Sequence, residues 1–176
     1  PVRSGRYLDV VVILRAPLPE LSTSEASAAR ELKTALSNWA PAFTALFDHS
    51  TRWTRWPLFA APRLKSWVDG PIALAGDAAH AMLPFAAQGA AMGIEDAAVL
   101  ADCLAEAKGD GSKVGESLLR YERLRRSRVA RAQRLAVTNR MLYHLPPPMS
   151  QARDLGMQIL GGKRLLARQG WLYRWT

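Results

Sequence analysis

The residues best suited to chemistry stand in one string between positions 76 and 96, GDAAHAMLPFAAQGAAMGIED. Just before it, the apolar residues 72–75 are typical of a short strand, which would end at Gly76 and carry the Asp77 carboxylate at its tip. Open α/β sheets bind ligands outside the carboxyl ends of their strands. A carboxylate only accepts hydrogen bonds, so Asp77 suits hydroxyl groups better than phosphate. The pattern predicts a ligand site that begins at Asp77.

The second half of the string is made of small residues and leads into a helix. The small residues are Ala86, Ala87, Gly89, Ala90 and Ala91. Because they lack bulk, a flat molecule could approach the backbone amides closely. Apolar residues then recur at helical spacing as far as position 107, so a helix is expected to begin near residue 89. The unpaired N–H groups at its start carry partial positive charge, which suits an atom that becomes anionic during a reaction.

This string closely resembles the second flavin-contacting motif of class A FAD-dependent aromatic monooxygenases, of the salicylate and 3-hydroxybenzoate hydroxylase type. The match is strong from position 76 to 101 and looser at residues 1–5, 67–74, 121–128 and 171–173. The resemblance implies that the chain is the C-terminal portion of such an enzyme. The implied fold class is α/β, with α+β character in this chain, as part of an FAD/NAD(P)-binding Rossmann-type flavoprotein. Remnants of a substrate-domain sheet would be followed by C-terminal helices.

The resemblance also implies a role for individual residues. The cofactor FAD would contact Gly76, Asp77, Pro84, Gly89, Ala90 and Ala91. Asp77 would bind a ribitol hydroxyl, and the amides of Ala90 and Ala91 would hold the pyrimidine edge of the flavin. Pro84 and Gln88 are the catalytic candidates. Pro84 would lie beside the flavin near the reacting carbon, and Gln88 would either face the substrate pocket or satisfy nearby backbone groups.

The implied reaction is hydroxylation of a small phenolic or benzoate-like substrate by O₂, through a flavin C4a-hydroperoxide, with NADH or NADPH as reductant. The glycine-rich G-x-G-x-x-G fingerprint that would bind the ADP half of FAD does not occur in these 176 residues. We therefore expect a truncated piece that is inactive alone, its activity belonging to the parent protein. Two alternatives stay open: a helical interaction module without a redox role, and a flavoprotein reductase of the same fold.

Simpler explanations compete for some of these residues. Asp77 could be a helix N-cap, and His80 is expected to pack in the core rather than to catalyse. Trp53 and Trp56 could line a substrate pocket, although large aromatic residues in strands usually belong to the core.

Three regions are expected along the chain. Residues 1–70 would be the remainder of a substrate-binding sheet domain, with strands at 7–14 and 51–58 and helices at 24–36 and 41–47. Residues 71–108 would be the flavin-contacting strand, loop and helix. Residues 109–176 would be helical, with a Gly-rich turn at 108–113, helices at 116–143 and 150–160 and an aromatic tail from position 171.

The arginine-rich helix expected at 116–143 has two kinds of arginine. At 100° per residue a solvated face is shared by Arg120, Arg123, Arg126, Arg131 and Arg134. Arg125 and Arg128 fall inside the opposite apolar arc, which also holds Leu118, Tyr121, Leu124, Val129, Ala132, Leu135, Ala136, Leu142 and Tyr143. A buried charge is costly unless paired, so each should meet a carboxylate, with Glu95 and Asp96 as candidates.

The composition argues against nucleic-acid-binding, metal-binding and membrane proteins. The formal net charge of +9 fits a basic surface, and no nucleic-acid-binding module accompanies it. The one cysteine, Cys103, cannot form an internal disulfide and offers no metal cluster, which favours a cytoplasmic protein without a metal. No apolar run is long enough to cross a membrane. The expected partners are a small aromatic substrate and O₂, with neither nucleic acid nor membrane; a homodimer stays open.

Overall fold

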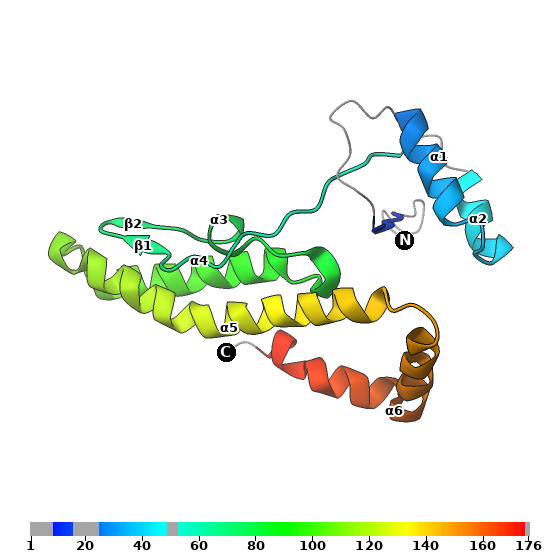
Figure 1. The fold of residues 1–176 in the computed structure, drawn as a ribbon. Coiled ribbons are helices and arrows are strands. Elements are labelled where there is room, and N and C mark those ends of the chain that lie inside the picture. Colours follow the sequence, from blue (N-terminus) through cyan, green and yellow to red (C-terminus); the bar gives the residue numbers. More distant parts are fainter. Residues whose placement is uncertain (1–8, 16–24, 49–52, 175–176) are drawn as a thin grey trace. The chain divides into compact units, whose positions relative to one another are not determined.

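The chain is mostly helical and carries one small two-stranded sheet (Figure 1). The computed structural model describes residues 9–15, 25–48 and 53–174, and the chain divides into two compact units, residues 1–58 and 59–176. The elements are α1 (Glu25–Ala35), α2 (Pro41–Asp48), β1 (Val68–Asp69), β2 (Ile72–Ala73), α3 (Asp77–His80), the 3-10 turn η1 (Pro84–Ala86), α4 (Gly89–Glu106), the 3-10 turn η2 (Gly111–Lys113), α5 (Val114–Tyr143) and α6 (Met149–Tyr173).

In the first unit, the predicted helices are confirmed and the predicted strands are wrong over their described residues, whereas positions 7, 8, 51 and 52 lie outside the described part of the chain. The helices α1 and α2 share a small core of Leu32, Leu36 and Phe47. The described parts of the two expected strands, residues 9–15 and 53–58, have no regular secondary structure. A strand needs a hydrogen-bonded neighbour, and in the described part of this unit neither segment has one.

The apolar side chains of those two segments are used for packing instead. Val12 and Trp53 pack against the small core of the first unit, and the Trp53 ring centroid lies 5.3 Å from that of Phe47. Trp53 is therefore a core residue, as the simpler explanation had it. Trp56, three residues later, is 76% exposed and takes no part in this packing.

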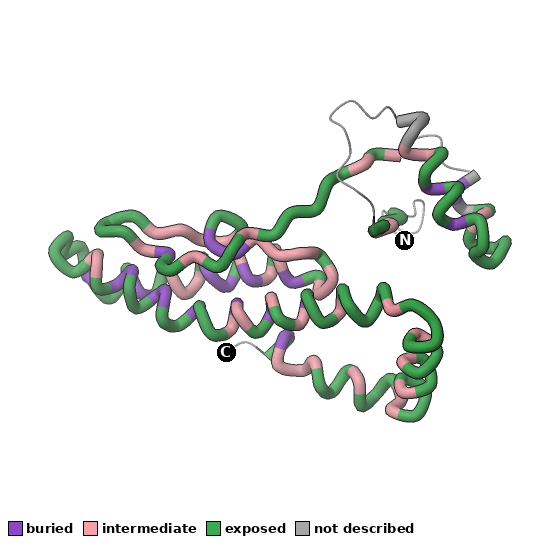
Figure 2. The backbone as a smooth tube through the Cα atoms, in the orientation of Figure 1, coloured by how far each residue is buried: buried purple, intermediate pink, exposed green. Residues whose placement is uncertain are grey.

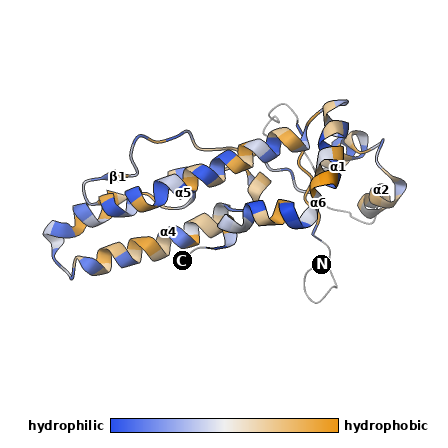
Figure 3. Ribbon diagram, turned by 90° about the horizontal axis from the view of Figure 1, so that it is seen from below, coloured by the Kyte–Doolittle hydropathy of each residue, from blue (hydrophilic) through white to orange (hydrophobic). Residues whose placement is uncertain are grey.

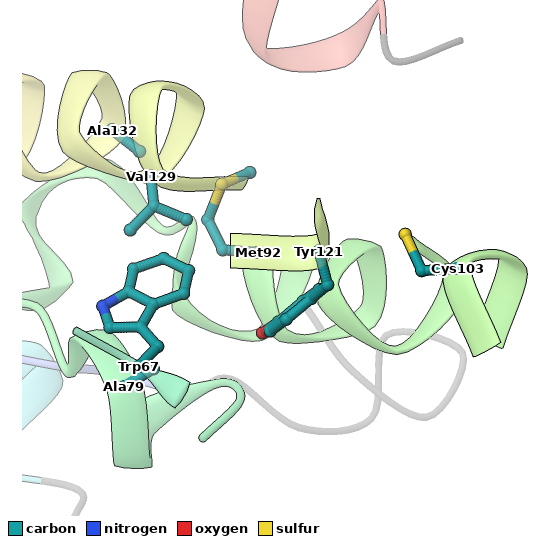
Figure 4. Packing of buried hydrophobic residues seen from close by; sticks show 7 residues of the cluster. All are labelled: Trp67, Ala79, Met92, Cys103, Tyr121, Val129 and Ala132. Atoms are coloured by element: carbon teal, nitrogen blue, oxygen red, sulfur yellow. The ribbon is translucent and has the colours of Figure 1, made fainter. Parts of the chain in front are cut away.

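The second unit is built on the antiparallel pair α4 and α5, which lie side by side in two views (Figures 1 and 3). Buried residues line the faces that these helices turn toward each other and toward the hairpin (Figure 2). The core cluster consists of Trp67, Ala79, Met92, Cys103, Tyr121, Val129 and Ala132 (Figure 4). The core therefore joins the residues before the site string to both long helices.

The strand expected at 72–75 is confirmed for its first two residues only, which form one arm of an antiparallel hairpin. Ile72 and Ala73 pair antiparallel with Asp69 and Val68 around a turn at Gly70, whose φ is 55°. Regular pairing then ends, although the Leu74 amide still donates to the Trp67 carbonyl at 2.8 Å. The site string therefore follows a two-residue arm of an antiparallel hairpin.

The helices after residue 88 follow the sequence expectation closely, with two corrections. The five arginines predicted on the solvated face of α5 are all exposed. Leu124, Leu142 and Tyr143, which the helical wheel placed in the apolar arc, are 53%, 39% and 59% exposed.

The other correction concerns α6. It runs through both the predicted helix 150–160 and the aromatic tail, up to Tyr173. It bends at Gly161, whose φ of 71° and ψ of 152° are not helical.

The described residues contain neither a helix suited to a membrane nor a cluster of metal ligands. None of their helices combines the length and the apolar character that crossing a bilayer would require. No group of His, Cys, Asp and Glu among them could hold a metal ion. Cys103 is a buried free thiol, and burial raises its pKa above the ordinary value.

Candidate functional site

The site string opens with a backbone turn that only glycine adopts easily. Gly76 has φ 56° and ψ −138° and occupies the N-cap position of the short helix α3. Asp77 is thus the first residue of α3 rather than its N-cap, which is Gly76. The N-cap alternative for Asp77 is therefore wrong. Its carboxylate stands exposed at the surface and is free to meet a ligand.

The start of α4 lies next to this carboxylate. A Cβ added to Gly89 would stand 4.0 Å from Oδ1 of Asp77. The first helical amide with a backbone acceptor is that of Met92, which donates to the Gln88 carbonyl at 2.9 Å. Among the described residues, the amides of Gly89, Ala90 and Ala91 have no acceptor. Unpaired donors and an acceptor carboxylate therefore meet at one place.

The loop between α3 and α4 is held by the second half of α5. Asn139 donates from Nδ2 to the carbonyl of Phe85 at 2.9 Å, and Gln133 donates to the carbonyl of His80 at 3.4 Å. The Phe85 ring packs near those of Tyr143 and His144, with centroids 6.3 Å and 5.6 Å away. Helix α5 thereby determines where the η1 turn lies.

The two catalytic candidates both lie on this loop. Pro84 is exposed and is the first residue of η1, where its ring suits the first position of a helical turn. Gln88 is 5% exposed and occupies the N-cap of α4 without capping it. Since no side-chain hydrogen bond of Gln88 occurs within the described chain, it does not satisfy backbone groups there.

Behind the site lies a buried network of charged groups that the string alone did not reveal. Asp96 is fully buried. Its Oδ2 accepts from the Gly76 amide at 2.9 Å and faces Nε2 of His80 at 2.5 Å. Its Oδ1 accepts from Nε of Arg125 at 2.7 Å. His80, 2% exposed, is therefore a packed and paired histidine, as expected.

Comparison with known proteins identifies the family. Residues 1–136 match the FAD binding domain family, which is more than half of the 176-residue chain. The chain belongs to this family. The resemblance of positions 76–96 to FAD-dependent aromatic monooxygenases is thereby confirmed at the level of the family, and FAD is confirmed as its cofactor.

Relatives of this FAD binding domain chain include aromatic hydroxylases. A salicylate hydroxylase of Pseudomonas putida is 35% identical over 180 residues, which covers 98% of this chain and 41% of the relative. A 3-hydroxybenzoate 6-hydroxylase of Polaromonas naphthalenivorans (strain CJ2) is 28% identical over 179 residues, which covers 100% of this chain and 43% of the relative. The chain thus spans about two-fifths of the length of these relatives.

One solved structure supports the fold. The crystal structure of tetracycline destructase Tet(51) superposes with a TM-score of 0.51 at 19% identity, covering 87% of this chain and 41% of that one. At this identity the likeness concerns the fold alone.

The residues of the FAD binding domain chain fit part of the cofactor. A flavin offers ribitol hydroxyls as donors and ring carbonyls as acceptors; the site offers the Asp77 carboxylate and three unpaired amides from Gly89 onward. Positions 86, 87, 89, 90 and 91, which flank these amides in the sequence, are alanine or glycine and add little bulk. A planar ring can therefore reach the backbone.

The arginines predicted to need carboxylates have them. Arg125, 2% exposed at its side chain, donates to Glu95 at 2.7 Å as well as to Asp96. Arg128 makes a bidentate pair with Glu95 at 2.6 Å and 2.5 Å. Arg128 also donates to the carbonyls of Trp171 and Leu172 near the end of α6. The prediction that Glu95 and Asp96 are the partners is confirmed.

Ionisation of both carboxyl groups is favoured by this network. Burial opposes the charge on Asp96 most strongly, but hydrogen bonds from His80, Arg125 and Gly76 together lower its pKa below the ordinary value. Burial likewise opposes the charge on Glu95, and Arg128 and Arg125 lower its pKa. The network therefore contains two carboxylates at neutral pH.

The second unit is expected to lose stability in acid because of these two groups. A carboxyl whose folded pKa is depressed stabilises fully above its unfolded pKa, about 4, and loses that contribution as the pH falls toward the folded pKa. Urea unfolding followed from neutral pH to about pH 3 should show a falling midpoint below about pH 4. Asp102→Asn, which removes an exposed carboxylate of α4, should leave this profile unchanged. A midpoint independent of pH down to about 3 would contradict the prediction.

Proposed function

We propose that the whole protein carrying this chain is an FAD-dependent monooxygenase that hydroxylates a small phenolic or benzoate-like substrate. The proposal is carried by one observation: the Asp77 carboxylate lies beside three unpaired amides at the start of α4, in a chain of the FAD binding domain family. Two relatives whose names state hydroxylation of salicylate and of 3-hydroxybenzoate support the substrate class.

Asp77 and the start of α4 would hold the cofactor. The carboxylate would accept hydrogen bonds from ribitol hydroxyls, for which an acceptor with two oxygens is suited. The amides of Ala90 and Ala91 would donate to the pyrimidine edge, and the α4 dipole would favour negative charge there. FAD, when bound, supplies the redox chemistry that activates O₂ toward the aromatic ring.

Pro84 and Gln88 would face the reaction from the loop between α3 and α4. Pro84 has no N–H group and is exposed, so it would border the flavin with an apolar surface. Gln88 has an amide without a hydrogen bond among the described residues, and it would orient the substrate through that amide. Anchored by Asn139, the loop would keep both side chains in place.

The proposal extends to the rest of the protein. The reductant would be NADH or NADPH, and a Rossmann-type FAD/NAD(P)-binding fold would contain residues 71–108 as its flavin-contacting segment. Residues 1–70 and 109–176 would contribute the substrate-domain remainder and the C-terminal helices. The single buried thiol, Cys103, agrees with a cytoplasmic location.

The test is made on the whole protein, purified with its flavin and given NADH or NADPH. Salicylate and 3-hydroxybenzoate are the first substrates, because hydroxylated benzoates match the relatives. We expect reductant consumption matched by hydroxylated product. Consumption that yields only peroxide with every aromatic acid would favour the reductase alternative, and absence of bound FAD would favour the interaction module.

Asp77→Ala is expected to weaken FAD binding by about tenfold to a hundredfold, because hydrogen bonds to a carboxylate are lost. The measurement is a flavin titration of the apoprotein followed by fluorescence. Asp102→Ala removes an exposed carboxylate from α4 away from the site and serves as the matched control. Equal affinities of the two variants would exclude Asp77 as a flavin contact.

A further inference from the structure

The segment that carries Asp77 is fastened to α4 by a single buried oxygen. Oδ2 of Asp96 accepts from the amide of Gly76 and pairs with Nε2 of His80. These two groups flank Asp77 in the sequence, one residue before it and three after it. The short helix α3 is therefore tied to α4 at both of its ends, with the exposed Asp77 carboxylate between the ties.

Helix α4 presents one face to this segment. Gly89, Gly93 and Asp96 recur at intervals of four and three residues, so they share that face. A Cβ on Gly93 would stand 3.6 Å from the Cα of Gly76, and a Cβ on Gly89 would stand 4.0 Å from Asp77 Oδ1. Asp96 thus lies on the same face of α4 as Gly89, which stands at the end of the helix where the unpaired amides are.

Arg125 holds the anchoring carboxylate in a single orientation. Its Nε donates to Asp96 Oδ1, while Nη1 donates to Glu95 and Nη2 to the carbonyl of Met92 at 3.2 Å. All three nitrogens of the guanidinium are thereby directed at α4. With Oδ1 occupied from α5, Oδ2 is the oxygen left to receive Gly76 and His80.

The histidine in this arrangement is better explained by its hydrogen bond than by its bulk. Its Nδ1 is buried without a partner among the described residues, and its ring lies 5.2 Å from that of Trp67. An apolar side chain would fill the same space without leaving a buried nitrogen unsatisfied. The Nε2 contact with Asp96 is what an apolar side chain could not supply.

We propose that Asp96 and His80 are positioning residues of the flavin site, which hold the Asp77 carboxylate against the unpaired amides of α4. They act through the backbone of residues 76–80 and touch neither cofactor nor substrate. The inference rests on the proposed function, because the distance between the Asp77 carboxylate and the α4 amides is important only if one ligand binds to both. Arg125 supports Asp96 from α5 and is itself paired with Glu95 of α4.

Two variants of His80 separate positioning from packing. His80→Gln keeps an N–H donor near the place of Nε2, whereas His80→Leu keeps the bulk without a donor. Direct replacement of Asp96 is avoided, because it would also leave Arg125 without its partner. Flavin titration of the whole protein should show His80→Leu weakened by about tenfold to a hundredfold and His80→Gln close to wild type. If His80 served only for packing, His80→Leu would bind FAD at least as tightly as His80→Gln.

A second readout needs no flavin. Amide hydrogen exchange of Ala79, residue 80 and Ala81, which donate within α3 to Gly76 and Asp77, should accelerate about tenfold or more in His80→Leu. Exchange around Val129 in α5 should be unchanged, and His80→Gln should exchange like wild type.

The outcomes keep the two proposals apart. If the wild-type protein binds no FAD, the proposed function fails, and the exchange rates alone decide whether His80 and Asp96 position the segment. If FAD binds but Leu and Gln behave alike in affinity and in exchange, the positioning role is overturned while the proposed function stands.

Discussion

Replacement of Arg125 with methionine is expected to destabilise the unit 59–176 by about 3–5 kcal/mol, the range for removing one partner of a buried ion pair. Arg125 is 1% exposed and donates to both Glu95 and Asp96. Without it Glu95 would keep Arg128, whereas Asp96 would keep only His80 and the Gly76 amide as partners. Methionine has a similar length and helix propensity, so the charge and its hydrogen bonds are the main loss.

Urea unfolding of Arg125→Met measures this effect, with Arg123→Met as its matched control. Arg123 is an exposed arginine two residues earlier on the same helix, and its replacement should change stability by less than about 0.5 kcal/mol. The same unfolding midpoint for both variants would show that the buried network contributes no more than a surface charge.

The second large effect is expected from Gly76→Ala, which should cost about 1–3 kcal/mol and weaken FAD binding about tenfold or more. The backbone of Gly76, at φ 56° and ψ −138°, lies in a region that side chains with a Cβ avoid. Space is not the obstacle, because the added Cβ would lie 3.8 Å from the Cα of Gly93, an ordinary contact. Relief of the strain would turn Asp77 away from α4.

Thermal unfolding and flavin titration check this prediction together. Gly162→Ala is the matched control, because its added Cβ would meet nothing within 4 Å and its backbone is helical. That control should be neutral or stabilise by up to about 1 kcal/mol. If Gly76→Ala retained the stability and the flavin affinity of wild type, the direction of Asp77 would not depend on the turn at Gly76.

Local signals predicted the helices well and the strands poorly. The bounds of α4 and α5 agree with the expected ranges within two residues, because apolar periodicity, caps and breaking residues all act within a few positions. The expected strand at 7–14 rested on a run of β-branched residues, and that at 51–58 on partial alternation with two tryptophans. A strand depends on pairing with residues elsewhere in the chain, and composition carries no information on that.

The helical wheel of α5 was right about charge and partly wrong about apolar residues. Its 100° periodicity separated the exposed arginines from Arg125 and Arg128, and the cost of an unpaired buried charge predicted a carboxylate partner for each of these two. It placed Leu124 in the core, yet Leu124 is 53% exposed. Which apolar residues become buried depends on which helix packs on each face, and periodicity does not contain that choice.

The sequence by itself indicated the family and singled out the string 76–96 as the candidate flavin contact, because a resemblance depends on the order of small, acidic and apolar residues along one short stretch. Only the tertiary structure decided that Asp77 lies beside the unpaired amides of α4 and that one oxygen of Asp96 joins Gly76 to His80. Gly76 and His80 are 20 and 16 residues away from Asp96 along the chain. Their meeting depends on how α3, α4 and α5 pack, which no local pattern specifies.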